Sequence, residues 1–130
     1  MTRTAKKEVN KNGLQNRIRF IQGNAENEEL IGDLGKFNLI YSTFSLHHWK
    51  DPMKVIRNCL NALTQDGVLF LYDLRRVWWL YSLPIHNGFL DSIRAAYIKT
   101  ELQQMVESIG VENYEIKSEF PFMQLIICKK

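Results

Sequence analysis

Apolar and polar positions along the chain follow two periods in turn, one helical and one strand-like. Helical spacing of apolar residues or helix-favouring composition predicts helices at residues 4–12, 25–34, 51–63, 87–97 and 100–110. Alternation or short continuous apolar runs predict strands at residues 17–22, 37–42, 68–72, 114–120 and 122–128.

Local signals mark where some of these elements begin. Asp51 is placed to accept backbone N–H bonds as an N-cap, and Pro52 suits the first helical position because no donor is needed there. Thr100 and Gln103 have the spacing of a capping box. Asp66-Gly67 predicts a turn before the apolar run 68–72, which is typical of a parallel strand covered on both faces.

The order of the elements indicates the fold class. Helices and strands alternate before the chain ends in two strands around Pro121. Alternation of this kind predicts an α/β sandwich with a mostly parallel sheet, and the last two strands predict an antiparallel β-hairpin. We expect residues 1–130 to form a single domain.

Composition and charge narrow the range of partners. The chain has 130 residues, of which 45% are apolar and 24% charged, and its net charge is +3. Because the basic residues are dispersed, we expect no nucleic acid as partner, and no apolar run is long enough to span a membrane. Cys59 and Cys128 do not form a C-x-x-C arrangement, so we interpret them as reduced core thiols of a cytoplasmic protein.

Two histidines follow the strand at 37–42 and are candidates for chemistry. A metal site is not expected, because the adjacent side chains of His47 and His48 rarely point at one ion and no ligand cluster surrounds them. A general base in contact with substrate is one interpretation, since histidine titrates near neutral pH. A structural role in the loop between strand and helix is the other.

An aromatic and basic segment, Arg75–Tyr81, follows the strand at 68–72. It is interpreted as a cover over a substrate, as core filling or as a dimer contact. Contact with a membrane surface is less favoured because no basic amphipathic helix of useful length is present. We expect Trp78 and Trp79 to be largely buried, in the core or in a dimer contact.

Several stretches, taken together, resemble the class I S-adenosylmethionine (SAM)-dependent methyltransferase family. Ile18–Glu26 is similar to a strand that ends in Gly-Asp-Ala, and Phe37–His48 followed by Asp51-Pro52 is similar to an F-D-x-x-x-S…L-H-H…D-P block. Leu60–Asp73 resembles the turn that leads into the fifth strand of the family. Tyr97–Gly110 and the final hairpin resemble its last helix and its last two strands. The resemblance covers about residues 10 to 130. It is closest to small-molecule methyltransferases, including the quinone-biosynthesis type.

The resemblance implies SAM as cofactor and an unknown small molecule as substrate. It places Gly23, Asn24 and Ala25 at the adenine and Ser42, Thr43 and Phe44 at the methionine part of SAM. Asn24 has an alternative role as a cap of the acidic helix, and Ser42–Phe44 have one as a self-contained turn. It also implies substrate contacts for His47, His48 and Trp78.

The sequence departs from the family pattern in the part that normally holds SAM. None of its seven glycines forms G-x-G, Asn24 and Asn38 replace aspartates, and Gln65-Asp66-Gly67 replaces Pro-Gly-Gly. We therefore expect an N-terminally truncated Rossmann-like methyltransferase domain lacking the glycine-rich unit, which binds SAM weakly or not at all. An active enzyme would then need an N-terminal polypeptide, or a second copy in a homodimer, to complete the cofactor site. Without such completion, the domain would act as a catalytically silent binding or assembly module.

With strands numbered as in the family, we predict a five-stranded sheet of order 3-4-5-7-6. The strand Arg17–Gln22 is expected to slide inward and pair in parallel with Phe37–Ser42, because this covers an apolar edge. Ile18 and Phe20 would then bond to the backbone of the neighbouring strand.

Overall fold

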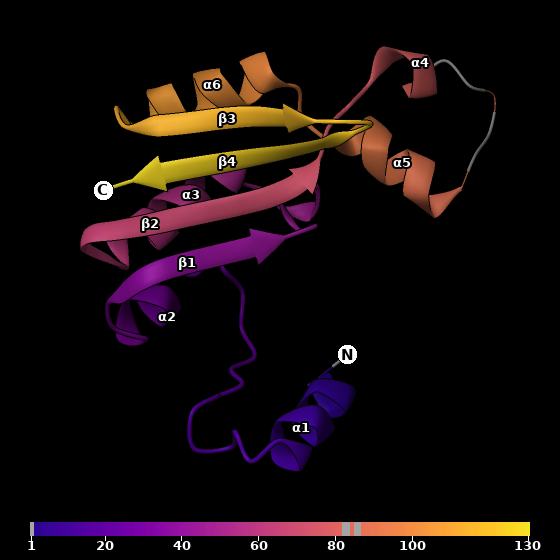
Figure 1. Ribbon diagram of the computed structural model, residues 1–130. Helices are drawn as coiled ribbons and strands as arrows, with labels where there is room; N and C mark the ends of the chain where they lie inside the picture. Colours follow the sequence, from indigo (N-terminus) through magenta and orange to yellow (C-terminus); the bar gives the residue numbers. More distant parts are fainter. Residues whose placement is uncertain (1, 82–83, 85–86) are drawn as a thin grey trace.

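The computed structural model describes residues 2–81, 84 and 87–130, and its elements follow the predicted order (Figure 1). The helices are α1 (Thr2–Lys11), α2 (Glu28–Asp33), the 3-10 helix η1 (Leu46–His48), α3 (Pro52–Asn61), α4 (Trp78–Tyr81), α5 (Gly88–Ala95) and α6 (Lys99–Ser108). The strands are β1 (Phe37–Thr43), β2 (Leu63–Leu74), β3 (Tyr114–Glu119) and β4 (Met123–Lys129).

The strands form one mixed four-stranded sheet of order β1-β2-β4-β3. β1 and β2 are parallel, and β4 runs antiparallel to both of its neighbours. In the family numbering used above, this order corresponds to 4-5-7-6. The α/β class, the parallel pair and the terminal hairpin are therefore confirmed.

The predicted fifth strand is not formed, so the order 3-4-5-7-6 is wrong for this chain. Residues 17–22 have no regular secondary structure. The amide of Ile18 donates to the carbonyl of Leu14 at 3.0 Å instead of pairing with β1. At the other end Gly23 packs so closely on Leu30 that an added Cβ would lie 2.1 Å from its Cδ2. Held at both ends, the segment runs apart from the sheet towards α1 (Figure 1).

β2 begins earlier than the sequence predicts. The turn expected at Asp66-Gly67 lies inside the strand, where the register moves from Phe37 opposite Leu63 to Leu39 opposite Val68. The extra residues on β2 form an irregular stretch, so the turn signal marks a change of register and not the start of the strand.

Helix ends show which local signals are reliable. The Asp51 side chain accepts from the amide of Lys54 at 3.0 Å, and Pro52 begins α3, as predicted. The capping box predicted at Thr100 is wrong, because Thr100 lies inside α6. The reciprocal bond is made two positions earlier in each partner, where the Glu101 carboxylate accepts from the amide of Ile98 at 2.9 Å.

The main core lies on one face of the sheet, between the strands and the helices α3 and α6. Leu69 and Leu71 of β2 are fully buried there against Ile56 of α3 and Leu102 of α6. A second cluster covers the carboxyl end of the opposite face, where α4 and α5 pack near Leu74. The two clusters together fix the ends of β1 and β2, where the candidate site lies.

The rest of that opposite face is open in the described part of the chain. Alternation in β2 directs Val68 and Phe70 away from the main core, and neither belongs to either cluster. Their neighbours in register on β1 are exposed: Leu39 at 57% and Tyr41 at 70%. An apolar strip therefore crosses the sheet on this side.

The tryptophan prediction is wrong for the core of this chain. Trp78 is 81% exposed and Trp79 is also exposed, because α4 packs through Leu80 and leaves both indoles at the surface. Burial in a dimer contact is not tested by a single chain.

Both cysteines are free thiols, as expected. Cys128 is buried in the main core, and Cys59 packs beside it. Burial raises the pKa of each thiol to about 11, so neither is a ready nucleophile at neutral pH. In the part of the chain that is described, no helix combines the length and apolar character needed to cross a membrane.

Candidate functional site

The carboxyl ends of β1 and β2 lie side by side and carry three of the predicted site residues. Ser42 and Thr43 end β1, and the amide of Phe44 donates to the Tyr72 carbonyl at 2.9 Å. Phe44 is an exposed residue with φ +53, a backbone conformation that favours glycine. Such strained residues concentrate at functional sites, which makes this turn a candidate ligand contact.

Tyr72 shapes the same edge from β2. Its ring meets the ring of Phe44 edge to face, with centroids 6.1 Å apart. Its hydroxyl donates to the Glu119 carboxylate at 3.0 Å, and this hydrogen bond raises the pKa of the Tyr72 hydroxyl. The rings of Phe44 and Tyr72 therefore form an aromatic surface at the end of the sheet.

A buried His–Asp pair lies at the centre of this edge. Asp73, at the end of β2, is 2% exposed, and the side chain of His47 is 3% exposed. His47 Nδ1 lies 2.5 Å from Asp73 Oδ1, and the amide of Leu46 donates to Asp73 Oδ2 at 2.5 Å. One carboxylate therefore fixes both the loop and the imidazole.

The neighbouring histidine has a different environment. His48 is exposed, and its ring lies against that of His47 with centroids 3.9 Å apart. Within the described residues no group of three or more His, Cys, Asp or Glu side chains is arranged to hold a metal ion.

The loop before α2 contacts both α3 and the residues that precede α3. Asn58 is buried and donates to the Ala25 carbonyl at 2.9 Å, while the Glu26 carboxylate accepts from the amides of Lys50 and Asp51 at 3.2 and 3.3 Å. The structure therefore brings the predicted adenine segment to the loop that carries His47.

Asn24 does not cap the acidic helix. Its side-chain oxygen accepts from the amide of Glu26 at 2.9 Å, and the cap of α2 is Asn27, which accepts from Leu30 at 3.0 Å. The exposed amide group of Asn24 stays at the surface of the loop. The capping role that was the alternative prediction for Asn24 therefore belongs to Asn27.

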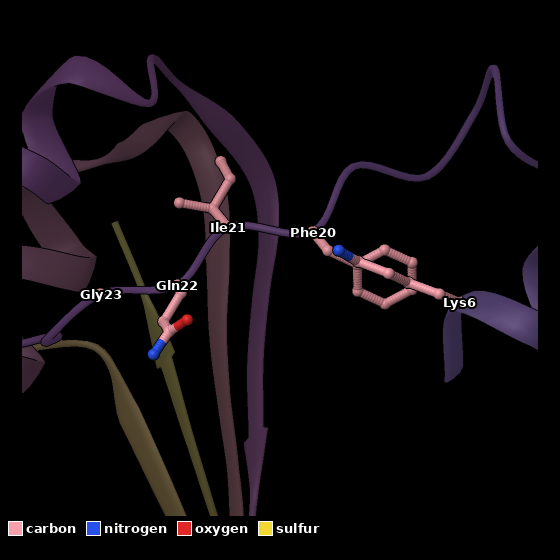
Figure 2. A pocket seen from close by; sticks show the side chains of 5 residues that line it. All are labelled: Lys6, Phe20, Ile21, Gln22 and Gly23. Atoms are coloured by element: carbon pink, nitrogen blue, oxygen red, sulfur yellow. The ribbon is translucent and has the colours of Figure 1, made fainter. Parts of the chain in front are cut away.

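Gly23 lies apart from the other predicted cofactor residues. It lines a separate pocket of about 330 Å³ with Phe20, Ile21 and Gln22 of the extended segment and Lys6 of α1 (Figure 2). Ser42, Thr43 and Phe44 do not line this pocket. The structure therefore distributes the predicted residues over an edge, a loop and a separate pocket.

Trp78 lies in α4, directly beyond the end of β2. α4 packs on α5, and α5 contacts η1, which contains His47 (Figure 1). Of these two helices it is α5 that contacts the His47 loop, while the Trp78 ring is at the surface.

Asp73 is the residue that sequence reasoning missed. Ligands gather at the carboxyl ends of parallel strands, which indicates a site after the strand 37–42. By the same rule, the residue that follows the strand 68–72, which is Asp73, is also a candidate. A charged residue that directly follows a buried apolar run was the available signal. Glu26 and Asn58, which tie the loop to α3, carried no comparable signal.

Comparison with known proteins gives the family. The family model described as Methyltransferase domain matches residues 1–71, which is more than half of the chain. The chain belongs to the class I SAM-dependent methyltransferases. The match includes the predicted adenine segment, β1 with the Phe44 turn and the His47 loop.

Individual methyltransferases are similar over different extents. The Ubiquinone biosynthesis O-methyltransferase of Glaesserella parasuis serovar 5 (strain SH0165) is 31% identical over 88 residues, which is 68% of this chain and 32% of that protein. An O-methyltransferase family protein from Burkholderia thailandensis superposes with a TM-score of 0.73 at 15% identity, over 97% of this chain and 40% of that one.

A third methyltransferase was solved with a cofactor product. The plantazolicin methyltransferase BamL, in complex with a triazolic desmethylPZN analog and SAH, superposes with a TM-score of 0.67 at 15% identity, over 85% of this chain and 59% of that one. At such identities the two structures show only that the fold is shared. The chain spans about a third of the length of the curated relative it matches.

Proposed function

We propose that this chain forms the acceptor side of a SAM-dependent O-methyltransferase that acts on a hydroxyl group of a small molecule. The buried pair of His47 and Asp73 at the carboxyl edge of the sheet carries the proposal. The names of the Glaesserella parasuis relative and of the Burkholderia thailandensis structure support oxygen as the acceptor atom.

His47 is the proposed general base. Because its Nδ1 is held by the Asp73 carboxylate, Nε2 is the nitrogen available to accept a proton. The acceptor hydroxyl gives its proton to Nε2, and its oxygen forms the new bond to the methyl carbon. Asp73 then stabilises the imidazolium. SAM, when bound, supplies an electrophilic methyl group and leaves as its demethylated product.

The residues of this chain fit one half of SAM. The exposed amide of Asn24 offers hydrogen bonds to an adenine edge, and the strained turn at Phe44 presents backbone at the end of β1. The family receives the methionine end of SAM at a G-x-G loop, and no G-x-G occurs among the seven glycines. The methionine end of SAM therefore lacks its usual backbone donors within these residues.

We infer that these 130 residues alone bind SAM weakly and need a glycine-rich unit to turn over. Each missing charge-assisted hydrogen bond removes roughly 1.5–3 kcal/mol, so two or three of them move a micromolar site towards millimolar. A unit in the same polypeptide and a unit in a second one would complete the same site.

A silent binding or assembly module is the second candidate. The uncovered apolar strip with Leu39 and Tyr41 favours it, because an exposed apolar surface of this kind marks an interaction site. This role needs neither SAM nor the His47–Asp73 pair.

A fusion protein separates the two candidates. The part of the Glaesserella parasuis relative that precedes its matched region is joined ahead of Met1, and binding of SAH is measured by calorimetry beside the unfused chain. Methyl transfer to a panel of phenols and catechols is followed by SAH release. We expect millimolar or weaker binding by the unfused chain, and micromolar binding with turnover by the fusion.

The role of His47 is tested in the same fusion. His47→Gln is expected to lower kcat by about 10²–10⁴-fold with SAH affinity unchanged. Lys50→Gln, on the surface of the same loop, is the matched control and should keep the parent rate. Equal rates for His47→Gln and its parent would remove His47 as the base. SAH binding without transfer to any phenol would favour the silent module.

A further inference from the structure

A half-buried arginine without an acidic partner lies at the carboxyl end of β2. Arg75 directly follows this strand, two residues after Asp73. Its guanidinium forms no ion pair with any residue that the structure describes. Its side chain makes one hydrogen bond, from Nη2 to the Pro121 carbonyl at 3.4 Å, and its Nε is buried without a partner. A guanidinium has five N–H donors, so the chain satisfies only a small part of its hydrogen-bonding capacity.

The acidic side chains of the neighbouring elements are bound elsewhere. Each has a partner within the chain: Asp73 with His47, Glu101 with Arg76, and Glu119 with Tyr72. Movement of one of these acids towards Arg75 would therefore break an existing interaction. Because a positive charge removed from water is costly unless an anion accompanies it, we expect the anion for Arg75 to come from a ligand.

Arg75 lies at the end of the sheet where ligands bind in folds of this kind. Its amide donates to the Phe122 carbonyl at 2.6 Å, and the Phe122 ring packs edge to face on Phe89 of α5, with centroids 5.3 Å apart. Figure 1 shows the end of β2 and the start of β4 beside α5. The pair of His47 and Asp73 lies at the same carboxyl end of β2. These contacts of Arg75 come from elements that follow β2, so its surroundings do not depend on what pairs with β1.

A single free guanidinium is suited to a carboxylate. Its planar N–H groups match the two oxygens of a carboxylate in a bidentate pair. One positive charge balances a monoanion, whereas a phosphate dianion needs a second cation, and the adjacent Arg76 is already neutralised by Glu101. Turning from the Pro121 carbonyl to a ligand gives up one hydrogen bond that is long at 3.4 Å, so the movement costs little.

We propose that Arg75 binds a carboxylate of the acceptor, and that the acceptor is an aromatic hydroxyl compound that also carries an acid group. Asp73 and Arg75 are two residues apart, which is roughly 7 Å in an extended chain, so one small molecule can reach both ends of the site. The methyl transfer rests on the proposed function, but binding of the acid group requires neither SAM nor His47.

The side-chain Nε–H resonance of Arg75 gives the first test. Phenylacetate, or its uncharged counterpart phenylacetamide, is added to the isotopically labelled full chain and followed by NMR. We expect phenylacetate to shift this resonance and to bind at least about tenfold more tightly than phenylacetamide. Arg75→Gln should abolish the preference, and Arg57→Gln, on the exposed face of α3, is the matched control that should keep it. Equal affinity of the parent chain for the two compounds would overturn the proposal.

Pairing between Arg75 and Gln124 is the internal alternative. Gln124 Oε1 is also buried without a partner, and its Nε2 donates to the carbonyl of Leu74, the residue before Arg75, at 2.9 Å. The same spectra of a Gln124→Met variant separate the two cases. An Arg75 resonance that ignores phenylacetate but moves in this variant would show that the two side chains bind each other, and the acid site would be rejected.

The fusion protein described above shows whether the acid group belongs to the acceptor. We expect Arg75→Gln to raise KM for meta-hydroxyphenylacetate about tenfold, with kcat unchanged and with KM for meta-hydroxyphenylacetamide unchanged. A fall in kcat for both compounds would indicate a structural role for Arg75 and would contradict the proposal. His47→Gln should leave phenylacetate binding intact. If the fusion transfers no methyl group, the proposed function fails, while the NMR titration still decides the acid site.

Discussion

Asp73 joins two segments of the chain through a single carboxylate. Its two oxygens accept from the amide of Leu46 and from Nδ1 of His47, and all three groups lie in the interior. A buried carboxylate of this kind is stable only while its hydrogen bonds are made, because leaving it unpaired carries the full cost of desolvation. The loop after β1 and the end of β2 are therefore coupled at this residue.

Replacing Asp73 by asparagine tests this coupling. The amide keeps the shape but turns an N–H group towards one of the two donors, so Asp73→Asn is expected to lower the free energy of unfolding by about 1–3 kcal/mol. Urea denaturation followed by circular dichroism gives the value. Asp66→Asn, at an exposed position of β2, is the control and should change the midpoint little. Equal midpoints for the two variants would show that the carboxylate contributes nothing to the fold.

At this scale the sequence predicts local contacts better than distant ones. The Asp51 cap on α3 was predictable because its partner is three residues away. The bond between His47 and Asp73 spans 26 residues, and nothing in the spacing of the two residues indicates that they meet. The exposure of Trp78 was mispredicted for a related reason, since burial depends on which neighbours a short helix acquires.

At the scale of elements, the strand β2 depends on a close approach to β1. A Cβ on Gly67 would lie 2.8 Å from the Cβ of Leu63 and 3.0 Å from the carbonyl oxygen of Phe37. These atoms belong to strand backbone or to its first side-chain carbon, so they cannot move aside cheaply. Gly67 is thus required where the register between the strands changes.

Gly67→Ala is therefore expected to destabilise the protein by about 1–3 kcal/mol. Gly88→Ala is the matched control, because a Cβ at Gly88 would meet nothing within 4 Å at the start of α5. The control should be neutral or stabilise by up to about 1 kcal/mol, as alanine reduces the freedom of the unfolded chain. Thermal melts of the two variants beside the parent decide the point, and a loss in Gly88→Ala equal to that in Gly67→Ala would contradict it.

Elements defined by their own sequence were predicted, and the one that needs a distant partner was not. Caps and apolar spacing determine α3 and α5 within about ten residues, so the structure has both. Residues 17–22 have a strand pattern, but a strand exists only when another strand lies beside it. Here the backbone bond from Ile18 to Leu14 and the packing of Gly23 on the Leu30 side chain hold the segment in another conformation.

At the scale of the whole molecule, α1 is the least supported element. Figure 1 shows it apart from the sheet, and the side chains of residues 3–11 are exposed with the sole exception of Val9, which is half-buried. A helix of this length has little stability without packing, so it is expected to open far more often than the sheet.

Limited proteolysis with trypsin follows this difference. We expect the first cuts after the exposed basic residues of α1 and of the irregular segment that follows it, which are Lys6, Lys7, Lys11, Arg17 and Arg19. Cleavage at Lys117 of β3 and Arg57 of α3 is expected only after long exposure, because cleavage needs local unfolding. Mass spectrometry of a time course identifies the order. An early cut inside β3 or α3 would show that α1 is held more firmly than its exposure suggests.

The one-sided layering of the sheet has a consequence for mutational tolerance. Leu69 and Leu71, which face α3 and α6, are enclosed by other side chains, and truncating either to alanine is expected to cost about 2–5 kcal/mol. Val68 and Phe70 alternate with them on the open face, where a polar side chain keeps its contact with water. Folding of these residues therefore does not require the open face to be apolar. A survey of tolerated substitutions is therefore expected to separate the two faces position by position along β2.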